Sequence, residues 1–175
     1  MEGKIKELEK LLSTDKRIII TTHTNPDGDA IGSSLALYHF LKKLNYTVSV
    51  VTPNKHPSFL NWVPGCNNVI VFDENIEKSE KLIQEADVIF TLDFNDLKRC
   101  GLIGENIAKY RHEVVMIDHH QSPSDYAKIS FSYPEISSTC ELVFKIIAKL
   151  NKRNLIDKDI STCLYLGMMT DTGSF

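Results

Sequence analysis

The sequence predicts an α/β fold in which a mostly parallel sheet carries helices on both faces. Short runs of aliphatic and β-branched residues alternate along the chain with longer segments of amphipathic helical periodicity. That alternation is typical of βαβ units, which place helices on both faces of a parallel sheet. Several of the apolar runs also end in aspartate or histidine. Parallel strands bring such ends to one edge of the sheet.

The first part of the chain predicts the order helix, strand, helix, strand. Residues 4–12 place four aliphatic side chains on one helical face, and the apolar run 18–22 is the first strand. Residues 29–44 have a broad apolar helical face, and small residues in the first turn allow close approach of a neighbour or a bound phosphate. Asn45 is a typical helix stop, and residues 46–51 are the second strand.

The middle of the chain is expected to hold two strands and one helix. Residues 59–65 are short, apolar and closed by a Pro-Gly turn. Trp62 in this segment is expected to be packed, and its alternative role is a base-stacking platform. Residues 69–72 predict a third strand, 76–85 a charged surface helix, and 87–92 a strand rich in β-branched residues.

The last part of the chain repeats the pattern. Residues 102–110 carry a weak helical signal, 113–117 form an apolar strand, and 128–132 read as an edge strand. A helix is expected over 138–150, because its first four residues have the spacing of a capping box. A last helix is expected to begin near Asp157.

Chain length, net charge and cysteine spacing limit the classes of function that this protein could have. A chain of 175 residues suits one domain, and its net charge of −3 argues against broad electrostatic binding to long nucleic acid. This net charge is compatible with a short or anionic substrate that binds through metal ions. The four cysteines form no CxxC pair, so we expect reduced, packed thiols and a cytoplasmic protein. The sequence has no signal-peptide pattern and no apolar run of membrane-spanning length.

Histidines and aspartates gather at the ends of three predicted strands, where parallel strands would bring them together. They are His23, Asp27 and Asp29 after the first strand, Asp93 after another, and Asp118, His119 and His120 after a third. A bend at Gly28 would let both neighbouring carboxylates face one cavity. Close carboxylates repel each other unless cations lie between them, so we interpret the cluster as a metal site with room for two ions. The alternative is a polar strand-to-helix turn with Asp29 as the N-cap.

Ligands of this type favour Mn²⁺, Mg²⁺, Zn²⁺ or Fe²⁺ over a thiolate zinc site. Two ions about 3.5–4 Å apart, with one bridging Asp, would acidify a bound water to a pKa of about 7 and clamp a phosphoryl centre. No serine lies in a Gly-x-Ser-x-Gly elbow. Asp171 is either a helix-end carboxylate or a ligand, and Arg99 either reaches a phosphate or lies on the surface. His39 is expected to be structural, and His56 and His112 to be solvated.

Four motifs in order resemble the DHH phosphoesterase superfamily, most of all its nano-RNase/pAp-phosphatase branch. They are His23–Ala30, Leu92-Asp93, Asp118-His119-His120 and Gly167–Gly173, and the resemblance extends over essentially the whole chain after the first helix. It implies a phosphoesterase that removes mononucleotides from very short oligonucleotides and dephosphorylates 3′-phosphoadenosine 5′-phosphate. The family's usual cofactor is Mn²⁺, here two ions, with Mg²⁺ or another divalent metal as the alternative.

The resemblance also implies a role for each matching residue. His23 and Asp27 would bind one metal, Asp29, His119 and Asp171 the other, with Asp93 bridging, His120 facing the substrate phosphate and Asp118 orienting the neighbouring histidines. The catalytic residues would then be His120, Asp93 and Asp118, with Arg99 as a second substrate-binding candidate. The segment Ser138–Glu141 resembles a family feature near the site, and a helix cap explains it equally well.

Members of this branch continue into a smaller, substrate-gripping domain. We therefore expect residues 1–175 to be the DHH domain, with that second domain absent from this chain. Short single-stranded RNA or nucleotide phosphates are the expected partners, with no membrane; we also consider a homodimer. Two alternatives remain open: an enzyme resembling manganese-dependent inorganic pyrophosphatase, and a non-catalytic metal- or nucleotide-binding module.

Overall fold

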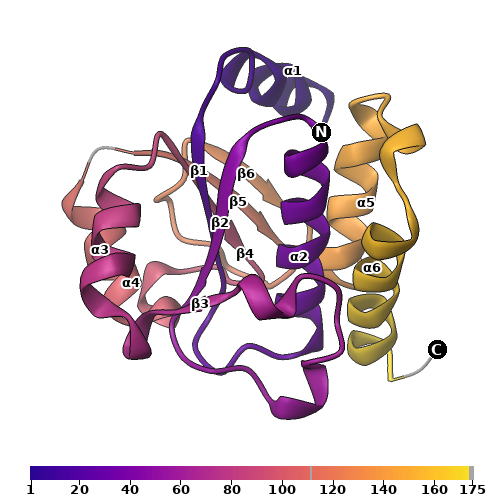
Figure 1. The fold of residues 1–175 in the computed structure, drawn as a ribbon. Helices are drawn as coiled ribbons and strands as arrows, with labels where there is room; N and C mark the ends of the chain where they lie inside the picture. Colours follow the sequence, from indigo (N-terminus) through magenta and orange to yellow (C-terminus); the bar gives the residue numbers. More distant parts are fainter. Residues whose placement is uncertain (111, 174–175) are drawn as a thin grey trace.

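The computed structural model describes residues 1–110 and 112–173. In this part of the chain, six strands form one parallel sheet with the order β3-β2-β1-β4-β5-β6 (Figure 1). The strands are β1 (Arg17–Thr21), β2 (Thr47–Thr52), β3 (Ile70–Val71), β4 (Val88–Leu92), β5 (Glu113–Asp118) and β6 (Ile129–Ser132). The predicted α/β class and parallel sheet are confirmed.

The helices lie between the strands in sequence, as the alternating pattern predicts. The α-helices are α1 (Glu2–Leu11), α2 (Gly28–Lys43), α3 (Ile76–Gln84), α4 (Leu102–Lys109), α5 (Thr139–Lys149) and α6 (Lys158–Asp171). Single 3₁₀ turns are η1 (Ser58–Leu60), η2 (Cys66–Asn68), η3 (Phe72–Glu74), η4 (Leu97–Cys100) and η5 (Arg153–Leu155). None of the described helices is long and apolar enough to cross a bilayer.

The central strand β1 shows why helices cover both faces of the sheet. Its side chains alternate in direction, so Ile18 and Ile20 pack into one apolar cluster and Ile19 into another. The first cluster joins the sheet to α1, α2, α5 and α6, and the second joins it to α3 and α4. Figure 1 shows α3 and α4 on one side of the strands and α2, α5 and α6 on the other. The prediction of helices on both faces is therefore confirmed.

Helices α2 and α6 pack at unusually short range. A Cβ atom built on Gly32 of α2 would lie 2.6 Å from the carbonyl oxygen of Cys163 in α6, far inside normal contact distance. The small residue at this position therefore accommodates a neighbouring helix, which is one of the two alternatives that the sequence leaves open. Ser33 and Ser34 are fully buried next to it, and both hydroxyls donate to the carbonyl of Ala30.

The third strand is shorter than predicted. Only Ile70 and Val71 pair with β2, and the chain turns into η3 at Phe72. Turn-forming residues follow at 73–75, where the backbone N–H of Asp73 donates to the carbonyl of Pro53 at 3.2 Å. The strand therefore begins one residue later and ends one residue earlier than the predicted range 69–72. At the other edge, β6 confirms the predicted edge strand.

Trp62 is not packed, so that prediction is wrong. Its side chain is 62% exposed, and Phe59 beside it is 68% exposed. Leu60 and Val63 are buried instead. The segment therefore packs on the core through its two aliphatic side chains, Leu60 of η1 and Val63 after it.

The histidine predictions outside the site have mixed outcomes. His39 is structural as expected, with Nε2 3.0 Å from the carbonyl oxygen of Pro64. His56 is buried rather than solvated, because Asn61 and Cys66 of the same connection lie 3.0 and 3.2 Å from its Nε2. His112 is half-buried against the carbonyl of Ala86. All four cysteines are free and buried, as predicted.

Candidate metal centre

The predicted site lies where the order of the strands reverses. From β1 the chain proceeds outward to β2 and β3, and then returns to place β4 on the other side of β1. The carboxyl ends of β1, β4 and β5 are consequently adjacent, and they deliver His23, Asp93 and Asp118. Such a switch point opens a crevice at the carboxyl edge of a parallel sheet, which is where open α/β folds bind ligands.

Asp27 ends the loop that connects β1 to α2. Its Oδ1 accepts hydrogen bonds from the N–H groups of Asp29 and Ala30, both at 3.1 Å, so Asp27 is the N-cap of α2. The expected alternative with Asp29 as the cap is wrong, since the helix already begins at Gly28. The left-handed residue of the loop is Asn25, with φ of 56°, rather than Gly28. Both carboxylates reach the site because they occupy the first helical turn.

His23 presents one nitrogen to the cluster. Its Nδ1 lies 2.7 Å from the carbonyl oxygen of Thr24, and since a carbonyl only accepts, this nitrogen carries the proton. Nε2 is buried with no hydrogen-bond partner, 3.5 Å from Oδ2 of Asp93 and 3.9 Å from Oδ2 of Asp27. A buried imidazole nitrogen with its lone pair aimed between two carboxylates fits a metal ligand.

Asp93 lies at the middle of the cluster and is only 2% exposed. Its backbone is left-handed, with φ of 67°, a conformation that Asp tolerates better than most residues. Its Oδ2 faces His23, whereas its Oδ1 lies 3.6 Å from Nε2 of His119. Thr139 donates its hydroxyl to the same Oδ1 at 2.9 Å. Each oxygen of Asp93 therefore faces a different histidine.

The second histidine, His119, is oriented in the same way as the first. Its Nδ1 lies 3.3 Å from the carbonyl oxygen of Ile136, which leaves Nε2 for the cluster. Nε2 lies 3.1 Å from Oδ2 of Asp171 and 4.0 Å from Oδ2 of Asp29. Asp171 is the last residue of α6, so its carboxylate projects from the end of that helix.

Asp29 is fully buried and is held by the first turn of α5. The backbone N–H groups of Thr139 and Cys140 donate to its two oxygens at 2.6 and 2.9 Å. Those N–H groups have no partner within their own helix, and a helix N-terminus favours a negative charge. Thr139 thus contacts both buried carboxylates, Asp29 and Asp93. The sequence left two interpretations of the segment 138–141, a helix cap and a family feature near the site. Ser138 does cap α5 through its hydroxyl, and the next two residues do lie at the site.

His120 and Asp118 form a separate pair at the opening of the site. Nδ1 of His120 lies 2.6 Å from Oδ1 of Asp118, which is fully buried. The side chain of His120 is 35% exposed, so it is accessible from solvent. Asp118 therefore orients His120 alone, because the ring of His119 is held by Ile136 instead.

Arg99 contributes to this edge through its backbone. Its carbonyl accepts from the N–H of Thr24 at 2.8 Å, and its own N–H donates to the carbonyl of Asp96 at 3.0 Å. These contacts fasten η4 to the loop that follows β1. The side chain of Arg99 is half-buried and takes part in none of the ion pairs found among residues 1–110 and 112–173.

Burial and the neighbouring charges shift the pKa values of several groups in the cluster. Burial, helped by repulsion from Asp93, raises the pKa of Asp29 to about 7, against the hydrogen bonds from Cys140. The hydrogen bond to Asp171 raises the pKa of His119 to about 9 despite burial. Burial alone would raise the pKa of Asp93, but the nearby charge of His23 and the hydrogen bond from Thr139 outweigh burial and lower it. Because the surrounding carboxylates favour protonation and a positive charge on the histidines, divalent cations that bind here would replace those protons.

Three groups of side chains have ligand atoms within 4.8 Å of one another. They are His23 with Asp27 and Asp93, Asp29 with His119 and Asp171, and Asp93 with His119 and His120. The first two groups correspond to the two ligand sets that the motif resemblance implies. Asp93 connects them, because it belongs to the first group and contacts His119 of the second.

The chain belongs to the DHH family. The family description "DHH family, N-terminal domain" matches residues 17–168, which confirms the resemblance seen in the motifs. Among curated proteins, the chain is 32% identical over 167 residues to a bifunctional oligoribonuclease and PAP phosphatase NrnA of Thermus thermophilus, covering 95% of this chain and 47% of that protein. The protein of the same name from Mycoplasma genitalium is 29% identical, with 99% and 52% covered. The chain thus spans about half the length of these relatives.

Solved structures support the same placement. A crystal structure of an exopolyphosphatase-related protein from Bacteroides fragilis matches with a TM-score of 0.98 and 46% identity, covering 100% of this chain and 52% of that one. Exonuclease RecJ bound to manganese matches with a TM-score of 0.57 and 17% identity, over 97% of this chain and 42% of RecJ. The similarity to RecJ shows a shared fold.

Proposed function

We propose that this chain is the metal-binding domain of a two-metal-dependent phosphoesterase that hydrolyses short oligoribonucleotides, 3′-phosphoadenosine 5′-phosphate or both. The observation that carries the proposal is the position of Asp93, whose two oxygens face two separate sets of histidine and aspartate side chains. A carboxylate between two ligand sets is the arrangement that a bridged pair of divalent ions requires. Mn²⁺ is the ion we expect, because it accepts mixed imidazole and carboxylate ligands.

The candidate ligands would form two sets, one for each ion. His23 and Asp27 would hold one ion, Asp29, His119 and Asp171 the other, and Asp93 both. When bound, the ions supply an acidified water and neutralise the charge of a phosphate. Backbone carbonyls hold both histidine rings with Nε2 toward the ions, and the first turn of α5 holds Asp29. Little reorganisation would then be needed when the ions bind.

His120 is the candidate group for contact with the substrate. Asp118 fixes its Nδ1, so Nε2 is free to contact a phosphate oxygen at the open side of the cluster. A protonated imidazole next to a buried aspartate can stabilise negative charge that develops in the transition state. Asp118 is thus a positioning residue. Arg99 stays a second substrate-binding candidate without a contact that supports it.

The nucleotide substrates are proposed from the relatives. Two of them are named oligoribonuclease and PAP phosphatase, and others are named cyclic-di-AMP phosphodiesterase at 24% identity. Because the chain spans about half of the NrnA relatives, part of the substrate selection is expected to depend on the second half of such proteins. Four buried free thiols suit the reducing cytoplasm, where we place the protein. Sedimentation velocity would test the homodimer.

The test compares Asp93→Asn with the wild-type chain. Asn removes the charge but tolerates the left-handed backbone of Asp93, so loss of the ions is not confused with backbone strain. Asp73→Asn is the matched control, since Asp73 is an exposed carboxylate after β3 at the same edge of the sheet. Calorimetric titration should find two Mn²⁺ per wild-type chain and per control chain. A full complement of tightly bound Mn²⁺ in Asp93→Asn would refute the bridging role.

Hydrolysis is then measured with Mn²⁺ on 3′-phosphoadenosine 5′-phosphate, a dinucleotide and pyrophosphate. The assay uses this chain alone and fused to the second half of an NrnA relative. Turnover of either nucleotide substrate that Asp93→Asn abolishes would support the proposal. A preference for pyrophosphate would favour the pyrophosphatase-like alternative. Nucleotide binding without turnover in both forms would favour a non-catalytic module.

A further inference from the structure

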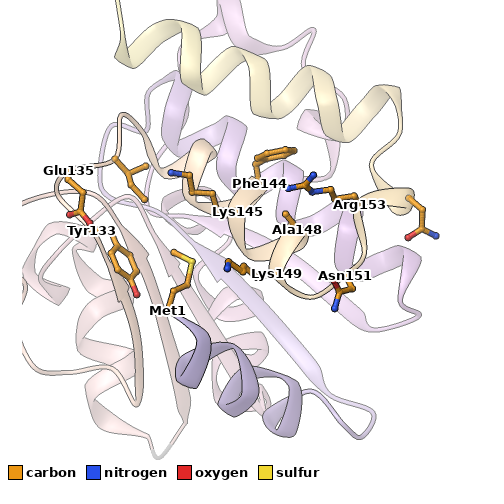
Figure 2. Close-up of a pocket in the computed structure, with 11 residues that line it drawn as sticks. Met1, Tyr133, Glu135, Phe144, Lys145, Ala148, Lys149, Asn151 and Arg153 are labelled. Carbon is orange, nitrogen blue, oxygen red and sulfur yellow. The ribbon is translucent and has the colours of Figure 1, made fainter.

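A groove of about 1120 Å³ lies along α5. It is lined by Met1, Tyr133, Glu135, Ile136, Phe144, Lys145, Ala148, Lys149, Asn151, Arg153 and Asn154. Figure 2 shows α5 with Phe144 beside Arg153, and Met1 and Tyr133 at the other side of the groove. These residues come from α5, η5, the segment after β6 and the first residue of the chain. None of them belongs to the candidate metal ligands.

The groove carries more positive than negative charge. Lys145 and Lys149 are one helical turn apart and therefore share a face of α5. Lys145 forms an ion pair with Glu141 at 2.8 Å, and Lys149 approaches the exposed Glu2 at 3.7 Å. Arg153 has no carboxylate partner among the ion pairs of residues 1–110 and 112–173. Its guanidinium lies over the ring of Phe144 instead, 5.7 Å from the centroid.

Two aromatic rings also face this groove. Phe144 is 36% exposed although it belongs to α5, whose other large apolar side chains are mostly buried. Tyr133 is half-buried, with Nζ of Lys4 lying 5.5 Å from the centroid of its ring. Among the described residues that line the groove, Glu135 is the one carboxylate. An unpaired guanidinium next to an exposed ring offers both contacts that a nucleotide needs: a charged fork for phosphate and a flat surface for a base.

The groove shares a wall with the metal centre. Ile136 lines the groove, and its carbonyl is the group that orients His119. Glu141, the partner of Lys145, also accepts hydrogen bonds from the N–H and the hydroxyl of Ser137, at 3.1 and 2.6 Å. A phosphate bound at Lys149 would lie one helical turn from Lys145, so it would compete with Glu141 for that ammonium group and thereby act on Ser137, the residue next to Ile136. The segment 133–137 connects the two sites physically.

We propose that this groove is a second binding site, separate from the metal centre, for a nucleoside phosphate. Lys149 and Arg153 bind the phosphate, and the base stacks on Phe144. Occupancy changes the affinity of the metal centre through segment 133–137. A free mononucleotide and the phosphorylated end of an oligonucleotide share this chemistry. The inference does not depend on the proposed catalytic activity, because the groove contains none of the residues assigned to it.

Binding is tested calorimetrically with AMP in EDTA, where the metal centre holds no ion that could bind phosphate. The double variant Lys149→Glu/Arg153→Glu should raise the Kd for AMP at least tenfold, and Phe144→Ala should raise it severalfold. Lys78→Glu is the control, since Lys78 is exposed on α3 on the opposite face of the sheet. Circular dichroism verifies the fold of each variant.

Three results would overturn the proposal. The first is that AMP at millimolar concentration gives no heat of binding. The second is that the double variant and Lys78→Glu bind AMP with equal affinity. The third is that inorganic phosphate binds as tightly as AMP and that Phe144→Ala has no effect. A 5′-phosphorylated dinucleotide, which is stable in EDTA, distinguishes a free mononucleotide from the phosphorylated end of an oligonucleotide as the ligand. Whichever of AMP and this dinucleotide binds more tightly identifies the ligand. The coupling requires that saturating AMP shifts the Mn²⁺ affinity of the wild type but not of the double variant. Equal shifts in both would refute the coupling.

Discussion

Replacing Gly167 by alanine should damage the fold and the metal centre together. Gly167 lies in α6, where α2 and α5 meet it. A Cβ atom there would be 2.2 Å from Sγ of Cys140, 2.4 Å from Oδ1 of Asp29 and 3.0 Å from Cα of Asp29. Both neighbours are fully buried, and ordinary contacts of a Cβ begin at 3.4 Å. The helices or the Asp29 carboxylate must therefore move by about 1 Å.

The size of the effect follows from three contributions. Overpacking a tight core costs about 1–3 kcal/mol, and weakening hydrogen bonds to a buried charged group costs about 1.5–3 kcal/mol. Alanine gains back about 1 kcal/mol, because it is a better helix former than glycine. We expect a net loss of about 3 kcal/mol in the free energy of unfolding. Displacement of Asp29 should also weaken Mn²⁺ binding by about tenfold or more, the usual effect of disturbing the support of a metal ligand.

Urea unfolding and Mn²⁺ titration measure the two effects. Gly3→Ala is the matched control, because Gly3 lies in α1 and a Cβ atom there meets nothing within 4 Å. The control should stabilise the protein by up to about 1 kcal/mol through helix propensity and leave Mn²⁺ binding unchanged. If Gly167→Ala behaved like Gly3→Ala in both measurements, the close packing of α2, α5 and α6 around Asp29 would be refuted.

Three further predictions concern single side chains. Thr139→Val removes the hydroxyl that donates to Asp93, so it should lower the free energy of urea unfolding by about 1–2 kcal/mol and weaken Mn²⁺ binding. Thr139→Ser should retain the stability and the Mn²⁺ affinity of the wild type. Identical behaviour of the two variants would contradict the contact. In EDTA the free energy of unfolding should fall by up to about 3 kcal/mol from pH 6.5 to 9, because folded His119, with its pKa of about 9, keeps a proton that the unfolded chain loses near 6.5. Saturating Mn²⁺ should remove that fall by displacing the proton, and a flat profile in EDTA would rule out the raised pKa. Trp62→Ala should change the free energy of unfolding by less than about 0.5 kcal/mol, since the side chain is 62% exposed; a loss above 2 kcal/mol would show that it is packed in solution.

The parallel sheet and the cluster at its edge could be predicted because both follow from local patterns. Alternating strands and helices indicate parallel strands, and parallel strands bring their ends together whatever lies between them. His23, Asp93 and His119 could thus be expected to converge, although β1 and β5 are far apart in sequence. Each of the three follows an apolar strand directly, so an error of one or two residues in a strand boundary does not matter.

The features that sequence reasoning missed depend on packing between distant segments. The resemblance places the segment 138–141 near the site, but it does not indicate that Thr139 contacts Asp93, 46 residues away, and Asp29, 110 residues away. The mostly apolar segment 59–65 predicts a packed Trp62, but only Leu60 and Val63 of this segment are buried against the core. Pattern and composition indicate that a segment packs, and the tertiary structure decides which of its side chains are buried.

The same carboxylates hold the helices and belong to the candidate metal centre, which limits how either can change. Asp27 caps α2 with one oxygen and faces His23 with the other, and Asp29 accepts from the first turn of α5 while it approaches His119. In the metal-free protein these helix N-termini offset part of the repulsion between buried carboxylates. The helices therefore keep the ligands in place before an ion arrives. It follows that a substitution at any of these carboxylates should lower the stability of the metal-free protein as well as its affinity for ions.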